Sequence, residues 1–180
     1  AALGEDSVVV ADIFNHAIRE VRLDGRVRTI VGGPDRKGYR DGPADGAQIA
    51  SPHGVGVSPD GVIAVAEAAN HTIRLLTPAR SSDGTTRYTV STLAGASGQE
   101  GDADGPATEA RFRSPHAAVF DRDGSLVNLE LPLRAGDPAG HCRVLPQAQE
   151  HAALDARHAR PPRRQGEGGG KGHAGAGAAD

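Results

Sequence analysis

"VVVADIFNHAIREV", residues 8–21, returns as "IAVAEAANHTIRLL", residues 63–76, at an offset of 55 residues. Six positions are identical in the two copies: Val10 and Val65, Ala11 and Ala66, Asn15 and Asn70, His16 and His71, Ile18 and Ile73, and Arg19 and Arg74. At a seventh position, Asp12 is replaced by Glu67, which keeps the negative charge. Identities in this order indicate an internal repeat, whose unit buries its apolar face against the neighbouring unit.

A second match extends the first. "VRTIVGG" (27–33) corresponds to "VSTLAGA" (90–96) at an offset of 63, because an insertion around "ARSSDGTTRY" lengthens the second copy. This offset then holds without a gap, and the residues that return are Gly38, Asp41, Gly42, Pro43, Ser51, Pro52 and His53 as Gly101, Asp104, Gly105, Pro106, Ser114, Pro115 and His116. The repeat is therefore one supersecondary unit of 55 to 63 residues.

The unit is predicted to consist of strands. Short β-branched runs alternate with Asp-Gly turns, a pattern typical of antiparallel sheets; these runs are 8–11, 27–31, 54–57, 62–66, 72–76, 88–94 and 117–120. Four of them fit between His53 and Gly95, which is the content of one propeller blade. We therefore expect an all-β, incomplete β-propeller with one full four-stranded blade flanked by two partial blades.

Two inserts of equal length, 32–50 and 95–113, join the blades. Each carries Gly-Pro-Ala before an Ala-rich stretch, which predicts one helical turn with Pro43 or Pro106 at its first position.

The composition changes near Glu130. From residue 131 to residue 180, Ala, Gly, Pro, Arg and His supply 35 of 50 positions, so little apolar surface is available to offset the entropy of ordering. We divide the chain into a propeller fragment, 1–130, and a low-complexity tail, 131–180, expected to lack secondary structure. The repeat motif also fails to return at 133–137, which suggests a frameshifted or mis-spliced reading frame; a genuine disordered extension is the competing interpretation.

The repeated segments resemble the NHL repeat, whose usual form is close to Y-V-A-D-x-x-N-H-R-I-R. The connection that runs from "TLAG" to "SPHGV" is similar to that of NHL repeats with long inserts, and the resemblance covers residues 7 to about 130. It implies a β-propeller, usually of about six blades, of which this sequence contains about two.

Four of the eight histidines fall on repeated positions. In the Asn-His pairs, we expect Asn to close the turn in the left-handed conformation, while His16, His71 and the Arg19 and Arg74 side chains pack along the blade edge. These four residues are also candidates for contact with a partner.

His53 and His116 each follow Ser-Pro at the start of an inner strand, so both are expected near the central axis. Converging neutral imidazoles from two or three blades could hold zinc. The resemblance extends locally to peptidylamidoglycolate lyases, NHL-type propellers in which a Pro-His holds zinc. We assign both residues to binding and assign no metal or cofactor.

Charge and motifs restrict the function further. The chain carries a net charge of −3, and residues 1–130 carry −5, which disfavours RNA despite a local strip of Arg19, Arg22, Arg26 and Arg28. One cysteine excludes an internal disulfide, and no apolar run is long enough to span a membrane. We expect a soluble, non-catalytic module for protein–protein interaction, whose open edges favour self-association. The alternative is a fragment of a metal-dependent lyase-like or lactonase-like propeller enzyme.

Overall fold

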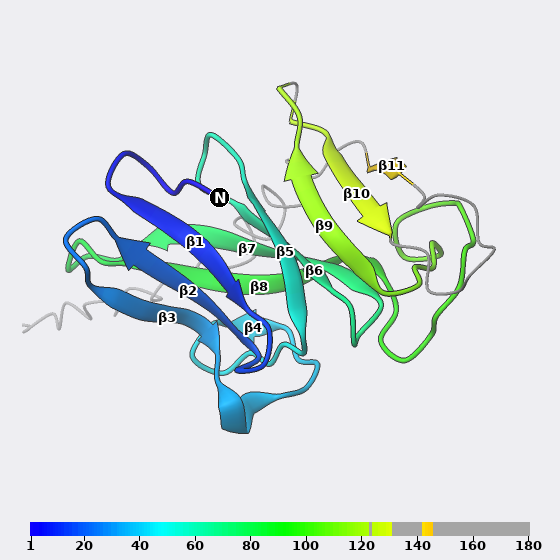
Figure 1. Ribbon diagram of the computed structural model, residues 1–180, viewed down its shortest axis with the longest axis horizontal. Coiled ribbons are helices and arrows are strands. Elements are labelled where there is room, and N and C mark those ends of the chain that lie inside the picture. The colour runs from blue at the N-terminus through cyan, green and yellow to red at the C-terminus, as the bar shows by residue number, and fades with distance from the viewer. Residues whose placement is uncertain (123, 131–141, 146–180) are drawn as a thin grey trace, which may run out of the picture.

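The computed structural model describes residues 1–122, 124–130 and 142–145, which form three antiparallel sheets (Figure 1). The first sheet has the order β1 (Ser7–Asp12), β2 (Ala17–Arg22), β3 (Val27–Gly32). The second contains β5 (Pro52–Val57), β6 (Ile63–Glu67), β7 (Thr72–Arg80) and β8 (Thr86–Gly95), with the two-residue β4 (Gly42–Pro43) on the outer edge of β8. The third contains β9 (Pro115–Phe120), β10 (Leu126–Glu130) and β11 (Cys142–Leu145).

One backbone hydrogen bond recurs at the equivalent position in all three sheets. The N–H of Leu3 donates to the carbonyl oxygen of Ser7 at 2.8 Å, and the same bond recurs as Ser58 to Val62 at 2.9 Å and as Asp121 to Ser125 at 2.7 Å. One full blade is thus flanked by two partial ones, which confirms the architecture expected from the repeat.

The turn between the second and third strands of a blade differs in detail from the expectation. The residues with positive φ are His16 (+50°) and His71 (+57°), not the asparagines before them. The amide of Asn15 instead bonds the Asp12 carboxylate, and Asn70 bonds Glu67 in the same way. The asparagine therefore holds the strand-end acid, and the histidine takes the left-handed conformation.

The inserts contain the expected helical turns. The N–H of Ala47 donates to the carbonyl oxygen of Pro43 at 2.8 Å, and Ala110 donates to Pro106 at 2.8 Å, so a single turn begins at each proline. The first insert also contains a 3-10 turn, η1 (Pro34–Arg36). Both inserts return the chain from the outer strand of one sheet to the inner strand of the next.

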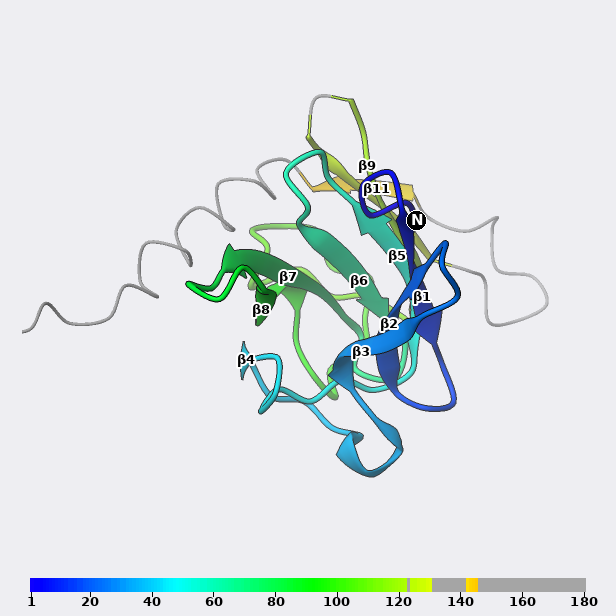
Figure 2. The same ribbon diagram turned by 90° about the vertical axis from the view of Figure 1, so that its left-hand side faces the viewer.

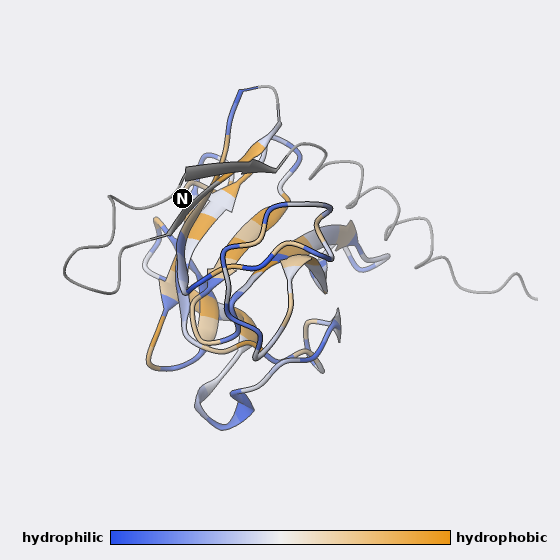
Figure 3. Ribbon diagram, turned by 90° about the vertical axis from the view of Figure 1, so that its right-hand side faces the viewer, coloured by the Kyte–Doolittle hydropathy of each residue, from blue (hydrophilic) through white to orange (hydrophobic). Residues whose placement is uncertain are grey.

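Apolar side chains fill the two spaces between the three sheets, and much of the hydrophobic colour in Figure 3 falls on strands. The space between the first and second sheets contains Val9, Ile18, Val31, Ile63, Val65, Leu76 and Val90. The space between the second and third contains Ala64, Ala66, Ile73, Leu75, Phe112, Ala118 and Leu126. Among the described residues, the second sheet is therefore packed against a neighbouring sheet on both of its faces.

Two glycines set how closely neighbouring blades approach. A Cβ atom at Gly54 would lie 2.4 Å from the carbonyl oxygen of His116, and one at Gly56 would lie 2.5 Å from that of Ala118. The inner strands β5 and β9 therefore pack almost backbone to backbone, as Figure 2 also indicates.

The segment after residue 130 is described only at Cys142–Leu145. These four residues form β11, paired antiparallel with β10, which departs from the expectation of no secondary structure there. The rest of the predicted tail, and with it the reading-frame hypothesis, lies outside the described residues. Within the described part, no helix is long and apolar enough to span a membrane.

Candidate functional site

A buried polar unit lies at the end of β6 in the second sheet. The Arg74 guanidinium donates through Nη1 to Oε1 of Glu67 at 3.0 Å, and the Asn70 amide donates to the other oxygen. Both Glu67 and Arg74 are 0% exposed. The pKa of Glu67 is raised to about 7, because the effect of burial outweighs the lowering by the positive charge of Arg74 and by the hydrogen bond from Asn70.

The first insert covers this unit. Nε of Arg74 donates to Oδ1 of Asp41 at 3.1 Å, and the backbone N–H of Thr92 donates to Oδ2 at 3.1 Å. The Arg74 guanidinium carbon lies 4.7 Å from the centre of the Tyr39 ring, a cation–π distance. The Tyr39 hydroxyl is 2.7 Å from Oγ1 of Thr92. One guanidinium thus binds two carboxylates and an aromatic ring.

The first sheet carries the same polar unit, built from Asp12, Asn15 and Arg19. Asn15 donates to both oxygens of Asp12 at 3.0 Å, and Arg19 lies 3.4 Å from the same carboxylate. Asn15 is exposed, whereas its counterpart in the second sheet is buried. The Arg19 Nε atom is buried and has no hydrogen-bond partner among the described residues.

The repeated Asn-His histidines connect one blade to the next. Nδ1 of His16 accepts a hydrogen bond from the N–H of Ser51 at 3.1 Å, and Nδ1 of His71 accepts from the N–H of Ser114 at 3.2 Å. Each accepting ring nitrogen must be unprotonated for this bond. The contacts of both histidines, like those of the buried Arg74, are therefore internal to the fold; their role toward a partner stays a prediction.

The two Ser-Pro-His histidines lie together at the start of β5 and β9. The ring centres of His53 and His116 are 4.3 Å apart, with an angle of 64° between the rings. Nδ1 of His116 is 2.5 Å from the carbonyl oxygen of Ser114. Burial and the neighbouring His116 lower the pKa of His53, which favours the neutral imidazole. Among the residues that the structure describes, no third His, Cys, Asp or Glu joins them.

The arginine strip of the first sheet is paired with carboxylates. Arg22 and Arg26 lie 3.9 and 3.8 Å from Asp24, and Arg28 bonds Glu20. Arg19 bonds Asp12, so each member of the strip has an acidic neighbour. This arrangement gives a surface of mixed charge.

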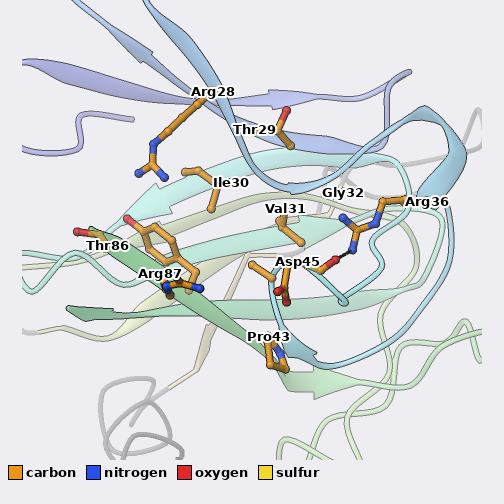
Figure 4. A pocket seen from close by; sticks show the side chains of 12 residues that line it. Arg28, Thr29, Ile30, Val31, Gly32, Arg36, Pro43, Asp45, Thr86 and Arg87 are labelled. Carbon is orange, nitrogen blue, oxygen red and sulfur yellow. Dashed lines mark hydrogen bonds between the residues drawn. The ribbon is translucent and has the colours of Figure 1, made fainter. Parts of the chain in front are cut away.

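A cleft of about 390 Å³ lies between β3 and β8 (Figure 4). Arg28, Arg36 and Arg87 surround it, and the Arg36 guanidinium is held by the carbonyl oxygen of Asp45. The buried Ile30 and Tyr88 line its interior. The cleft runs along the outer strands of two neighbouring sheets, and Asp45 is the one carboxylate among the described residues that line it.

Sheets stacked face to face through apolar cores define part of a β-propeller. A family model for the NHL repeat matches residues 50–74. The chain is 34% identical over 119 residues to NHL repeat-containing protein 2 of Bos taurus and 33% identical over 124 residues to that of Homo sapiens. These matches cover 65% and 68% of the chain but 15% and 16% of the relatives. The chain is a member of the NHL-repeat β-propellers and spans about two blades.

Solved structures agree on the fold. A Bacteroides thetaiotaomicron protein of unknown function superposes with a TM-score of 0.58 at 24% identity, covering 68% of this chain and 29% of that one. An auxiliary nutrient binding protein from the same organism gives a TM-score of 0.54 at 21% identity, covering 68% and 32%. At these identities the likeness establishes architecture alone.

Sequence reasoning missed the roles of Tyr39, Asp41 and Thr92 over Arg74. Asp41 carried a signal, because it returns as Asp104 within the ungapped match. A lone acid beside Gly-Pro is also ordinary turn chemistry, so the repeated aspartate alone indicated no role. Only the fold brings residue 41 to the outer strand that contains residue 92.

Proposed function

We propose that residues 1–130 form a non-catalytic protein-binding module whose binding surface is the face of the first sheet turned away from the second. We call this surface the leading face. Its apolar part consists of Val8 and Val10 on β1, Val21 on β2 and Val27 on β3.

The corresponding face of the second sheet supports this proposal. There the repeat places Ile63, Val65, Leu76 and Val90, all at most 1% exposed, because the first sheet packs on them. In the first sheet, Val8 is 38%, Val10 42% and Val27 49% exposed. The equivalent apolar residues of the second sheet are buried against a neighbouring sheet. The row on the first sheet is therefore suited to binding a similar sheet surface, because covering it removes apolar area from water.

The charge distribution supports a protein partner over a nucleic acid. The arginines of the first sheet are paired with Asp12, Asp24 and Glu20, and the propeller region carries net negative charge. The apolar leading face therefore predicts a partner that presents a sheet surface of apolar side chains.

Sedimentation velocity of the full chain over a range of concentrations tests the proposal, because a second copy presents sheet surfaces of this kind. We expect concentration-dependent association that weakens at least tenfold in the double variant Val8→Ser, Val10→Ser. Leu23→Ser, which removes a 76% exposed leucine from the β2–β3 turn, is the matched control and should associate like the parent. A monomer at every concentration, or equal association of both variants, contradicts the proposal.

A second candidate rests on the contact between His53 and His116. Two imidazoles with ring centres 4.3 Å apart supply two ligands for zinc, and a catalytic zinc site uses three from the protein. The described residues therefore supply two of the three protein ligands of a catalytic zinc site, and we derive no reaction from them. Titration of Zn²⁺ into the chain and into His53→Gln tests this candidate; equal uptake by both removes it.

A further inference from the structure

We propose that the cleft between β3 and β8 binds an acidic peptide segment, whose carboxylates pair with the arginines around it. The site consists of Arg28, Arg36 and Arg87 around a floor formed by Ile30 and Tyr88, and we call it the interblade cleft. It lies between the first and second sheets and is therefore separate from the leading face. The inference thus goes beyond the proposed function and adds a second binding site to the module.

The walls of the interblade cleft come from both of the sheets that meet there. One wall is formed by residues 28–32 of β3 and the other by residues 86–88 of β8, while Arg36 and residues 43–45 of the first insert close the cleft. The lining residues thus fall between positions 28 and 88, on both sides of the space that joins the two sheets. Its volume of about 390 Å³ lies in the range of ligand pockets.

The β8 wall is a feature of the second sheet that the repeat does not supply to the first. It belongs to the insertion around "ARSSDGTTRY", residues 79–88, which lengthens the second copy. As a result β8 has 10 residues, whereas its counterpart β3 has 6, and residues 86–88 pair with residues 78–80 of β7. Because the first sheet folds with the shorter hairpin, the strand pairing within a blade does not account for this wall.

Positive charge gathers in the interblade cleft although the region around it is acidic. Residues 1–130 carry a net charge of −5, whereas the residues that line the cleft include three arginines and one aspartate. The side chains of Arg28 and Arg87 are 49% and 70% exposed, so both can reach a ligand that arrives from solvent. A local cationic site on a molecule of net negative charge favours an anionic ligand that is short and fits the cleft.

Two of the arginines are positioned by contacts that occupy only part of each guanidinium. Among the described residues, Arg28 bonds Glu20 through Nε, and Arg36 bonds the carbonyl oxygens of Asp45 and Ala47 through Nη2. A guanidinium carries five N–H donors in a fixed fork and binds a carboxylate through two of them. Both side chains are therefore held in place and keep donors for a ligand.

Pairing with an internal acid does not prevent a second carboxylate from binding. Arg74 demonstrates this in the second sheet, because it binds Glu67 through Nη1 and Asp41 through Nε. Arg87 lies 3.8 Å from Asp83 in an exposed pair, and pairs of this kind contribute little free energy. A ligand carboxylate can therefore compete for Arg87 or share it.

The floor of the interblade cleft is apolar and separates the arginines. Ile30 and Tyr88 are 7% and 6% exposed, and Figure 4 shows Arg28 and Arg36 toward opposite ends of the lining residues. A peptide in which carboxylates alternate with small apolar side chains matches cations at the ends and apolar surface between them. A nucleic acid carries its phosphates in unbroken succession, which the acidic region around the cleft repels.

Fluorescence anisotropy with the full chain measures binding of a labelled, end-capped peptide of eight residues in which glutamate alternates with alanine. We expect saturable binding that weakens as the salt concentration rises. Arg36→Gln and Arg87→Gln should each weaken binding at least fivefold, and because Arg87 is largely exposed, its variant keeps the fold. The matched control Arg122→Gln, which removes an exposed arginine from the turn between β9 and β10, should bind like the parent.

Three results would overturn the interblade cleft as a site for acidic peptides. The first is a parent chain that does not bind the peptide saturably, and the second is equal affinity of the parent and Arg87→Gln. The third is tighter binding of a single-stranded RNA of the same charge, because the cleft then recognises phosphate. Val8→Ser with Val10→Ser alters only the leading face and should keep peptide binding, so this inference and the proposed function can fail independently.

Discussion

His16 of the first sheet accepts a hydrogen bond on Nδ1 from the backbone N–H of Ser51, which begins the second sheet, at 3.1 Å. The same bond joins His71 to Ser114 at 3.2 Å, one blade further on. Ser51 and Ser114 themselves have positive φ, of +46° and +50°, so the bond fixes a strained entry into each inner strand. The Asn-His pair of the repeat is therefore the connector between blades.

His71→Ala should destabilise the chain by about 1–3 kcal/mol, because the N–H of Ser114 loses its acceptor in a half-buried position. Urea unfolding followed by circular dichroism measures the effect. His71→Gly removes the ring but tolerates positive φ, so it separates the lost bond from backbone strain. If the glycine variant is as stable as the parent, the connector role is wrong.

Gly54→Ala should cost about 1–3 kcal/mol of unfolding free energy, because its Cβ would lie 2.4 Å from the backbone oxygen of His116 and the two inner strands would have to separate. Gly46→Ala is the matched control, since the nearest atom to a Cβ there is 3.7 Å away. Similar stability of the two variants in thermal unfolding would show that β5 and β9 are not in backbone contact.

Arg74→Leu should destabilise by about 3–5 kcal/mol, because Glu67 is left fully buried without its counter-charge. Arg19→Leu, at the repeat position one blade earlier, should cost about 1 kcal/mol or less, because the Arg19–Asp12 pair is partly exposed. Chemical denaturation of the two variants side by side measures the difference. Equal losses would mean that the insert does not seal the unit around Arg74.

The repeat in the sequence predicted most of the fold. Apolar residues that alternate on each strand, together with Asp-Gly turns, were enough to place the strands of the full blade, since these signals are local. Pro43 and Pro106 likewise predicted the helical turns, because proline is favoured at a first helical position whatever surrounds it.

The candidate site was only partly predictable. The meeting of His53 with His116 followed from their matching places on inner strands. The bridge from Asp41 to Arg74 and Thr92 was not predictable. Arg74 lies 33 positions and Thr92 lies 51 positions after Asp41, and their contact depends on the path of the insert. Residue type also misled: Asn15 and Asn70 were expected in the left-handed conformation, yet the histidines that follow them adopt it and bond the next blade.

Acidification should destabilise the chain through the pair of histidines on the inner strands. Burial and the neighbouring His116 lower the pKa of His53 below its ordinary value of 6.5. The unfolded chain therefore binds a proton more readily than the folded chain, so the contribution of His53 is fully present above pH 6.5 and is lost as the pH falls through the folded pKa.

Thermal unfolding at pH 7.5 and at pH 5.5 measures this effect as a difference between the parent and His53→Gln, which keeps a polar side chain that does not titrate. The midpoint of the parent should fall further on acidification than that of the variant, because only the parent has a titrating ring at residue 53 whose protonation the fold opposes. Carboxylates titrate equally in both proteins, so their contribution cancels in the comparison. The same shift in both proteins would mean that the contact between the two rings does not control the protonation of His53.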